Sequence, residues 1–348
     1  MYIVYVMSCE GKGNFDVSTL AHDMTYTSSI LGQPGKFTMT LEKDPNNVLE
    51  ISIGDKVLFM VDGKMVFSGK IFTLGTNRNE TYSITAYDQM RYLQNHDYLN
   101  LDGEENKSLE DIFTKICTSA ELTYTIKAPS PWVLEPHLFI DKSYFEILTH
   151  CITETNTKNE KMFFIRDKGG ILELNEVGVC QAEAGTPLII GTGSLLTDYN
   201  YSVDIDKETY TEVLLMENIK TSSKNSDKEQ TSKKLVYAKA DAETGRKWGR
   251  LRRIVNVKEQ ASKEELEEYA QLNLEVFAKS SKTMKLEALG YPVYAGDSFK
   301  LMLDKLGLCM DLYIKEATHT YGEVHTMSLN VATNRNMPDT LGKLEVKA

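Results

Sequence analysis

FTMTLE, at residues 37–42, opens a pattern that the sequence repeats. A Gly-Asp pair at 54–55 and the stretch NETYSITAYD at 79–88 follow it. In both stretches apolar and polar side chains alternate, which is the period of a half-buried β-strand.

The second copy of the pattern begins with KTMKLE at 282–287 and continues with Gly-Asp at 296–297 and GEVHTMSLNV at 322–331. The two Gly-Asp pairs lie 242 residues apart, and Glu80 and Glu323 lie 243 residues apart. Order, spacing and strand pattern agree over about fifty residues, and self-similarity at a fixed spacing indicates a repeated structural unit. We therefore expect two copies of one β-rich domain.

The first copy contains a clear hairpin signal. Asp62-Gly63 separates the apolar runs KVLFMV (56–61) and KMVFSGKIF (64–72). Asp-Gly favours a type I′ turn, because both central residues of that turn need positive φ. We expect a two-residue β-hairpin here.

Residues 105–180 change character and predict a small α+β module. Ser108-x-x-Asp111 and Ser143-x-x-Glu146 resemble capping boxes, each followed by apolar residues at helical spacing. KMFFIRDKGGILELNEV, at 161–177, predicts a second hairpin around residues 167–170. The fold class that follows is α+β, mainly β, with a small α+β domain inserted into a β-rich chain.

Residues 195–260 return to strand patterns, interrupted by KTSSKNSDKEQTSKK at 220–234. This stretch has no apolar side chain and cannot bury enough surface to offset its ordering entropy, so we expect a mobile loop. Ser262-x-x-Glu265 then predicts a helix over 263–279. Its buried side is expected to contain Leu266, Tyr269, Ala270, Asn273, Leu274 and Phe277.

These patterns predict three domains. The first β-domain covers 1–104, the inserted domain covers 105–194, and the second β-domain covers 195–348 with the 263–279 helix and the 220–234 loop. The strands near 196–218 either complete the first β-domain or open the second.

The composition excludes several classes of protein. The chain has 348 residues, a formal charge of −11 and a pI of about 5.2. Sequence-independent binding to nucleic acid needs clustered Lys and Arg, so it is not expected of this acidic chain. Five scattered cysteines without C-x-x-C signal neither a disulfide framework nor a zinc site. No apolar run approaches the length of a membrane span, and MYIVYVM at the start is expected to be a first strand rather than a signal peptide.

The motifs of common enzymes are missing from the sequence. The six histidines show no metal-ligand spacing, and neither G-x-S-x-G nor a phosphate-binding loop occurs. We therefore predict no catalytic, cofactor-binding or metal-binding residues. A non-enzymatic structural protein is therefore expected. Two alternatives to it remain open: a peptidoglycan- or carbohydrate-active enzyme on a β scaffold, and a monomeric β-rich adaptor. No carboxylate pair can be selected for glycoside hydrolysis.

One basic cluster, GRKWGRLRR at 245–253, stands out in this acidic chain. One interpretation is a strand with a solvated basic face. The other is a docking surface at a subunit boundary, because Arg and Trp are favoured at interfaces and an acidic partner would complement them. The candidate interface residues are Arg246, Lys247, Trp248, Arg250, Arg252 and Arg253.

ITAYDQMRYLQNHDYL, at 84–99, leads from the first β-domain into the insert. Asp88 and Arg91 are three residues apart and could pair locally, while Tyr87 and Tyr92 offer apolar bodies to pack. A catalytic site would need a pocket and a partner base. We interpret these four residues as a structural junction.

This stretch also carries a family resemblance. A strand ending T-A-Y-D-Q, followed by Arg91-Tyr92-Leu93 and Asp97, resembles the XkdQ-type proteins of phage-like elements. These are similar to the baseplate hub proteins of contractile phage tails and tail-like bacteriocins. TEVLLM at 211–216, Trp248-Gly249, the 263–279 helix and the closing GDSFKLML and HTMSLNV fall in the same order, so the resemblance covers about residues 35–335.

The resemblance implies a structural hub with two tail-tube-like β-barrel or sandwich domains. Three chains would form a homotrimeric ring of six similar domains, which joins the six-fold tail tube to the three-fold spike. The implied partners are the tail tube protein, the spike protein and other baseplate proteins, with tape-measure protein or DNA passing through the lumen without specific binding.

The same resemblance implies synthesis in the bacterial cytoplasm, assembly into a virion or tail-like particle, and release outside the cell. From the residues themselves we expect no cofactor and no membrane insertion by this chain. The sequence shows no fused lysozyme-like segment, so peptidoglycan cleavage would belong to a separate protein.

Overall fold

The computed structural model describes residues 1–30, 32–42, 44, 49–78, 81–100, 107–130, 132–158, 161–177, 188–206, 209–221, 230–257 and 262–332. Strands dominate these residues, as the mainly β expectation requires. The chain divides into two compact units, which we call unit 1 and unit 2. Unit 1 comprises Met1–Asn200 together with the described chain from Met284, and unit 2 comprises Tyr201–Thr283. The boundaries of unit 2 thus fall inside the expected second β-domain, 195–348.

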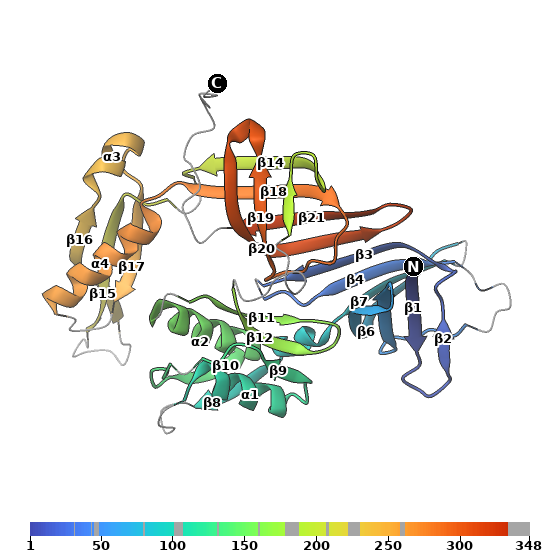
Figure 1. Cartoon of the computed structure of the whole chain (residues 1–348). Coiled ribbons are helices and arrows are strands. Elements are labelled where there is room, and N and C mark those ends of the chain that lie inside the picture. The colour runs from blue at the N-terminus through green and yellow to red at the C-terminus, as the bar shows by residue number, and fades with distance from the viewer. Residues whose placement is uncertain are drawn as a thin grey trace. The chain divides into compact units, whose positions relative to one another are not determined.

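The first half of unit 1 is an antiparallel sheet in the order β3-β4-β7-β6-β5-β1-β2 (Figure 1). Its large buried side chains include Phe37, Phe59 and Phe67, and the Phe37 ring stacks on both of the others. The strands are β1 Tyr2–Met7, β2 Asn14–Asp16, β3 Ala21–Ser29, β4 Lys36–Leu41, β5 Lys56–Val61, β6 Lys64–Thr76 and β7 Tyr82–Tyr87.

The hairpin expected at Asp62-Gly63 is confirmed. It joins β5 to β6, with Val61 opposite Lys64. Asp62 has a φ of 49° and Gly63 a φ of 77°, so both central residues have the positive φ that a type I′ turn requires.

The second half of unit 1 has the order β14-β18-β21-β20, with β19 also pairing with β20. The elements are β13 Ile189–Gly191, β14 Leu196–Asp204, β18 Ser281–Leu289, β19 Ser298–Leu303, η2 Asp304–Leu306, β20 Leu308–Tyr321 and β21 His325–Ala332. Strand β20 pairs antiparallel with β3, from Glu316 opposite Ser29 to Tyr321 opposite Met24. The two halves therefore form one continuous sheet (Figure 1).

The Gly-Asp pair of each half has the same backbone hydrogen bonds. The Gly54 amide donates to Ile71 O at 2.9 Å, and the Gly296 amide donates to Ile314 O at 2.8 Å. In return Ile71 N donates to Asp55 O, and Ile314 N donates to Asp297 O, both at 2.9 Å. The two glycines have φ of 94° and 88°, a conformation that disfavours any residue with a Cβ.

The aspartate side chains of the two turns also match. The Asp55 carboxylate accepts from Ser52 N at 2.8 Å, and the Asp297 carboxylate accepts from Tyr294 N at 3.0 Å. Both carboxylates are buried, and each closes its turn by accepting from the backbone amide three residues before it. The shared Gly-Asp pair thus marks one local structure that occurs twice.

A β-bulge recurs at the equivalent place. The register of β6 on β7 shifts between Ile71 and Thr73, and that of β20 on β21 shifts between Ile314 and Glu316. Bulges re-aim a strand and increase its twist. Strand by strand, β3-β4-β7-β6-β5 corresponds to β14-β18-β21-β20-β19.

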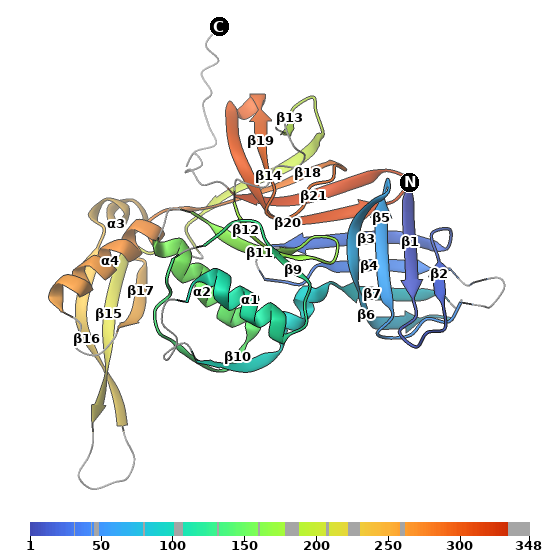
Figure 2. The same ribbon diagram turned by 60° about the horizontal axis from the view of Figure 1, so that its bottom comes forward.

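The module between these halves contains two helices and short strands (Figure 2). Strands β11 and β12 form a hairpin, and β9 pairs parallel with β12. Strands β8 and β10 form a separate two-stranded ribbon. The elements are η1 Gln89–Gln94, β8 His96–Asn100, α1 Leu109–Ser119, β9 Tyr124–Ile126, β10 Leu138–Ser143, α2 Tyr144–Lys158, β11 Phe163–Asp167 and β12 Leu172–Glu176.

Both predicted helix starts in this module are confirmed. Ser108 and Asp111 form a reciprocal capping box on α1. At the start of α2, Ser143 N donates to Glu146 at 2.9 Å and Glu146 N donates to Ser143 Oγ at 3.1 Å. The two helices share one apolar core with the strands, whose fully buried members include Leu109, Ile112, Phe113, Ile147 and Leu148.

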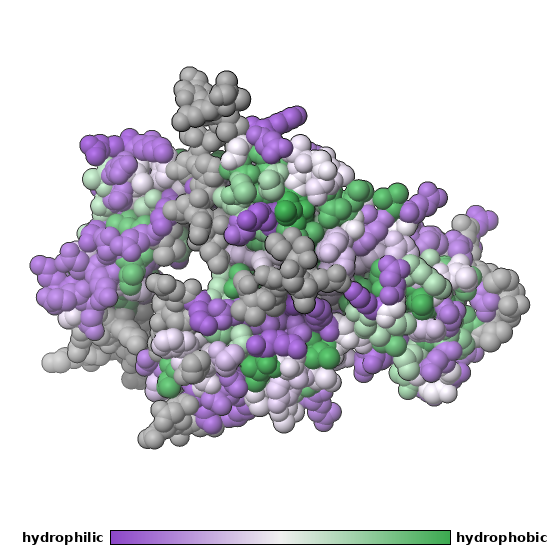
Figure 3. Space-filling view, in the orientation of Figure 1, coloured by the Kyte–Doolittle hydropathy of each residue, from purple (hydrophilic) through white to green (hydrophobic). Residues whose placement is uncertain are grey.

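Unit 2 is a three-stranded sheet, β16-β15-β17, with one helix, α4, packed on one face. The elements are β15 Glu212–Thr221, β16 Gln230–Ala240, α3 Ala242–Trp248, β17 Arg252–Val257 and α4 Lys263–Phe277. The predicted Ser262–Glu265 capping box is confirmed. Leu266, Ala270 and Leu274 are buried against the sheet as expected, and Figure 3 shows mainly hydrophilic residues over the outer side of this helix.

Two expectations for unit 2 were wrong. Tyr269 does not lie on the buried side of α4, because a single sheet needs only the narrow stripe Leu266–Ala270–Leu274, and Tyr269 is exposed. The 220–234 stretch is not all loop, because β15 continues to Thr221 and β16 begins at Gln230, where the two residues pair. The remainder of that stretch, 222–229, lies outside the described residues.

No helix in the described ranges is long and apolar enough to cross a membrane.

The repeated glycines give a matched test of this fold. We expect Gly54→Ala to cost about 1–2 kcal/mol, because alanine must adopt positive φ while its Cβ meets nothing closer than Cys9 Sγ at 3.6 Å. Gly296→Ala should cost about 1–3 kcal/mol more, because its Cβ would lie 2.1 Å from the Phe164 ring. Urea unfolding of the two variants beside the wild type measures both values. Equal losses would contradict the tight contact of the second turn with the insert.

Candidate functional site

The basic cluster does not form the continuous strand that its sequence favoured. Residues 242–248 form α3, and the strand β17 begins only at Arg252. The helix forms because Asp241 caps it, accepting from Thr244 N at 2.7 Å, and Gly249 ends it with a φ of 82°. The expected strand reading of residues 245–251 was therefore wrong.

Two of the cluster's arginines bind an acid of their own unit. Arg250 Nε lies 3.0 Å and Arg252 Nε 2.8 Å from Glu212 Oε2. The hydrogen bond from Arg252 is the main reason why the pKa of Glu212 is lowered. Arg253 instead lies over two aromatic rings, with its guanidinium carbon 4.0 Å from the Phe277 ring centre and 5.3 Å from that of Tyr210.

The remaining members of the cluster lie on α3. Arg246 and Lys247 are exposed, and Trp248 is half-buried. Arg246 Nε donates to Ala242 O at 3.1 Å, and the Lys247 ammonium lies 5.0 Å from the centre of the Trp248 ring. The cluster thus carries four exposed cations, of which Arg250 and Arg252 pair with the ionised Glu212.

Of the four junction residues, Asp88 is buried and hydrogen-bonded to the backbone, while the other three gather around Phe72. Asp88 follows β7, caps η1 and accepts from Gly35 N at 2.9 Å and Met90 N at 3.0 Å. The expected pair of Asp88 with Arg91 is not found in the described structure, because those two amides occupy the carboxylate. The Arg91 guanidinium lies 5.5 Å from the Phe72 ring centre, and the rings of Tyr87 and Tyr92 also contact Phe72.

Gln89, which ends the T-A-Y-D-Q motif and for which no role was predicted, binds the insert directly. Its side-chain nitrogen donates to Thr123 O and Gly170 O, both at 2.9 Å, and its oxygen accepts from Thr123 N at 3.0 Å. The amide thereby ties η1 to two loops of the inserted module.

A second buried carboxyl, Asp167, lies at the end of β11. Its Oδ1 accepts from Gly170 N at 2.8 Å, and its Oδ2 is buried without a hydrogen-bond partner. Burial raises the pKa of Asp167 to about 6. Burial, and then the charge of Asp167, raise the pKa of Asp88 well above its ordinary value.

Arg166, next to Asp167, is the most enclosed cation among the described residues. Its Nη1 donates to Asp297 Oδ1 at 2.7 Å and to Ala295 O at 2.9 Å, and its Nε donates to Glu173 at 3.1 Å. The sequence offered no signal for this cluster, because Arg166 and Asp297 lie 131 residues apart.

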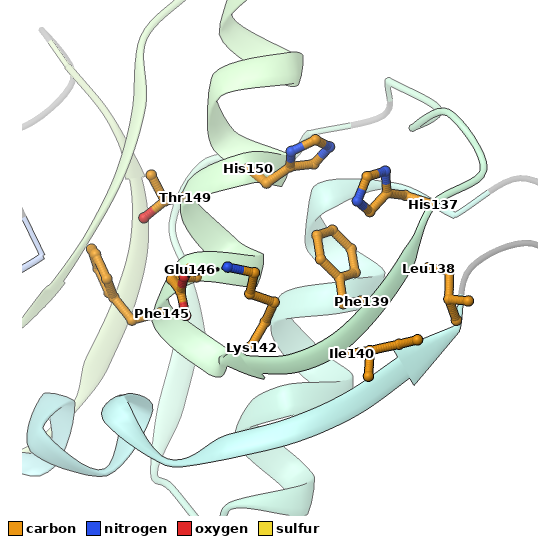
Figure 4. Close-up of a pocket in the computed structure, with 9 residues that line it drawn as sticks. All are labelled: His137, Leu138, Phe139, Ile140, Lys142, Phe145, Glu146, Thr149 and His150. Carbon is orange, nitrogen blue, oxygen red and sulfur yellow. Dashed lines mark hydrogen bonds and ion pairs between the residues drawn. The ribbon is translucent and has the colours of Figure 1, made fainter. Parts of the chain in front are cut away.

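The insert also contains a groove of about 600 Å³ beside β10 and α2 (Figure 4). His137 and His150 lie with ring centres 4.5 Å apart, and both contact the Phe139 ring. Burial, and then the neighbouring His137, lower the pKa of His150. Lys142 and Glu146 form an ion pair at 2.9 Å on the same wall.

The groove does not assemble a metal site. In the described ranges no group of three or more His, Cys, Asp or Glu is placed to hold a metal ion. His319, which is fully buried, lies between Val293 O at 2.6 Å and His325 Nε2 at 3.0 Å. Both ring nitrogens of His319 are thus hydrogen-bonded, whereas His137 and His150 contact each other and Phe139 through their rings.

The fold is that of phage tail proteins. The 43 kDa tail protein of prophage MuSo2 from Shewanella oneidensis superposes with a TM-score of 0.64 at 14% identity, over 96% of this chain and 98% of that one.

The chain belongs to the YqbQ-like family, whose model matches residues 24–332. It is 25% identical to YqbQ of Bacillus subtilis strain 168, over 83% of this chain and 84% of the relative. It is 23% identical to XkdQ, a protein of the phage-like element PBSX in the same strain, over 87% of this chain and 88% of the relative. The resemblance to XkdQ-type proteins is thus confirmed.

The raised pKa of Asp167 predicts a pH dependence of stability. A carboxyl with a higher pKa in the folded than in the unfolded protein binds more protons when folded. Its favourable contribution is therefore present below its ordinary pKa of 3.8 and is lost as the pH rises through about 6. The loss amounts to roughly 2–3 kcal/mol.

Asp167→Asn should remove this loss, because the amide stays neutral and keeps the acceptor for Gly170 N. The free energy of unfolding of the variant, relative to wild type, should rise by roughly 2–3 kcal/mol between pH 4 and pH 7. Urea unfolding at four pH values measures it, with Glu323→Gln, at an exposed carboxyl, as the control. A difference that stays constant with pH would rule out a buried, titrating Asp167.

Proposed function

We propose that this chain is a structural baseplate hub of a contractile tail or a tail-like bacteriocin. Three copies form a ring of six similar β-domains, which joins the tail tube protein to the spike protein. The family membership and the tail-protein fold support the role. The observation that carries it is the repeat: both halves of unit 1 share strand order, bulge and Gly-Asp turn.

The contact between the two halves suggests how copies would join. Inside one chain, β20 of the second half pairs with β3 of the first. The matching bulges make β6 the equivalent of β20. Thr25 and Thr38 share a hydrogen bond of 2.6 Å, and Ser202 and Thr283 share one of 2.8 Å, which makes β14 the equivalent of β3.

By this equivalence, β6 of one copy pairs with β14 of the next. Strand β14 is the last strand of the sheet order. Strand β5 pairs with β6 only as far as Lys70, so the later residues of β6 have β7 as their strand neighbour in the described part of the chain. An edge of this kind favours pairing with another chain. Three such contacts, alternating with three internal ones, close a six-membered ring.

The repeat also favours one reading of the domains. Because β14 corresponds to β3, the strand at 196–204 opens the second tube-like domain. The second domain then lies within 195–348 and carries unit 2 between β14 and β18. The α+β insert, expected at 105–194, already begins near residue 89, because β8 pairs with β10 and Leu93 and Leu99 belong to the core of the insert, so the first domain lies within 1–88.

The net negative charge of the chain is compatible with a ring through which DNA or protein passes. At −11 per chain, a trimer carries −33, and a negative lumen would not retain DNA or a tape-measure protein. In this role the chain is not an enzyme, binds other baseplate proteins, is assembled in the bacterial cytoplasm and leaves the cell in the particle.

The mass of the purified chain tests the ring. We expect light scattering to give three times 39.3 kDa at high concentration. A monomer at every concentration, with and without the tube or spike protein, would contradict the hub and favour the β-rich adaptor. Loss of turbidity of bacterial cell walls with the purified chain would instead favour the enzyme.

A cross-link locates the contact. Thr76→Cys on one copy and Val203→Cys on another should form a disulfide between chains, because Thr76 and Val203 are equivalent to the paired His319 and Tyr26. Cys9 and Cys309, which are exposed, are first replaced by Ser. Thr76→Cys mixed with Leu272→Cys, on the outer side of α4, is the control and should stay uncross-linked.

A further inference from the structure

The sheet of unit 2 has one face that none of the described elements of its own unit covers. Val213 and Leu215 point toward α4, so the alternating residues Leu214 and Met216 point the other way. Leu214 pairs with Ile254, and Met216 pairs with Leu235. We call the apolar surface formed by these last four residues the unit 2 sheet face. Ile254 is 59% exposed and Leu235 51% exposed.

Basic side chains flank this face at both ends. Arg252 lies on the same face two residues before Ile254 on β17, and the exposed Lys233 lies two residues before Leu235 on β16. Glu212, which lies opposite Arg252 on β15, is bound by Arg250 and Arg252. Residues 201–283 hold sixteen Lys and Arg against fifteen Asp and Glu, so unit 2 carries +1 while the rest of the chain carries −12.

The insert has an apolar surface of the opposite electrostatic character. In the β8–β10 ribbon, Phe139 and Leu99 pair and point into the core, so Tyr98, Leu138 and Ile140 point outward. Ile140 is 63% exposed. Leu138 and Ile140 also line the groove beside α2 (Figure 4).

Among the described residues, acids outnumber cations around this ribbon. Lys142 is the cation on its edge, and it is paired with Glu146. His96 is hydrogen-bonded to Asp141 at 3.0 Å, and Asp97 accepts from Tyr144. The acids on and beside the ribbon are Asp97, Glu135, Asp141, Glu146 and Glu154.

We propose that the unit 2 sheet face of one copy docks on the β8–β10 ribbon of the neighbouring copy in the ring. The proposal rests on the proposed trimer. Exposed apolar patches with polar rims mark interaction sites, and opposite rim charges select the partner. The basic rim of one surface meets the acidic rim of the other, while Ile254 and Leu235 cover Leu138 and Ile140. Two different surfaces of one chain meet head to tail, which is the arrangement that closes a cyclic ring.

Substitutions at the two isoleucines test the contact, because both side chains are more than half exposed and can be changed without opening a core. Ile254→Asp should weaken trimer formation about 30-fold or more, as loss of a central interface anchor does. Ile140→Lys should weaken it similarly. The double variant places the introduced carboxylate of each copy opposite the introduced ammonium group of the next, so it should recover at least about tenfold. Leu272→Asp, on α4 at 50% exposure, is the matched control and should leave the dissociation constant unchanged.

Sedimentation across a range of concentrations gives each dissociation constant. Unchanged values for both single variants would overturn the proposal and leave the hub intact. Weakening without recovery in the double variant would overturn the pairing, because each face would then meet another surface. A wild-type chain that stays monomeric in this experiment and with its tube and spike partners would instead refute the trimer itself.

Discussion

The ion pair between Arg166 and Asp297 is the interaction on which unit 1 depends. Both side chains are almost wholly buried, and the arginine satisfies three acceptors from two parts of the chain. Removing one partner of such a pair leaves an uncompensated buried charge, at a cost of about 3–5 kcal/mol. The pair therefore fixes the insert on the Gly-Asp turn of the second half.

The same pair explains how the two repeats differ. In the first half, the second oxygen of Asp55 accepts from Cys9 N at 2.9 Å, so the turn is held to the loop that follows β1. In the second half, the equivalent oxygen of Asp297 accepts from Arg166 at 2.7 Å. One local structure thus holds two different neighbours. With Asp88 and Gln89 at the other junction, the insert is fixed to both halves of the sheet.

Local chemistry allowed much of this fold to be predicted. Capping boxes at Ser108, Ser143 and Ser262 identified three helices, and Asp62-Gly63 identified a hairpin, because each signal involves residues close in sequence. The Gly-Asp spacing indicated the repeat. The short helix α3 was not predicted, because its seven residues bury no side chain and so give no apolar period.

Distant contacts could not be predicted in this way. Nothing in the sequence links Arg166 to Asp297 or β3 to β20, because these partners meet only when the whole sheet has formed. The buried state of Asp88 was hidden for the same reason: its amide partner Gly35 lies 53 residues away. Of the candidate interface residues, the sequence located the cations but not Glu212, which binds two of them.

The central claim is that one chain supplies two equivalent positions of a six-membered ring. A cryo-electron microscopy reconstruction of the assembled hub, refined with three-fold symmetry alone, tests it most directly. The account predicts the turns at Gly54 and Gly296 at six alternating positions of equal radius, with β6 of each chain beside β14 of the next. Turns at two different radii, or a ring closed through other strands, would contradict it.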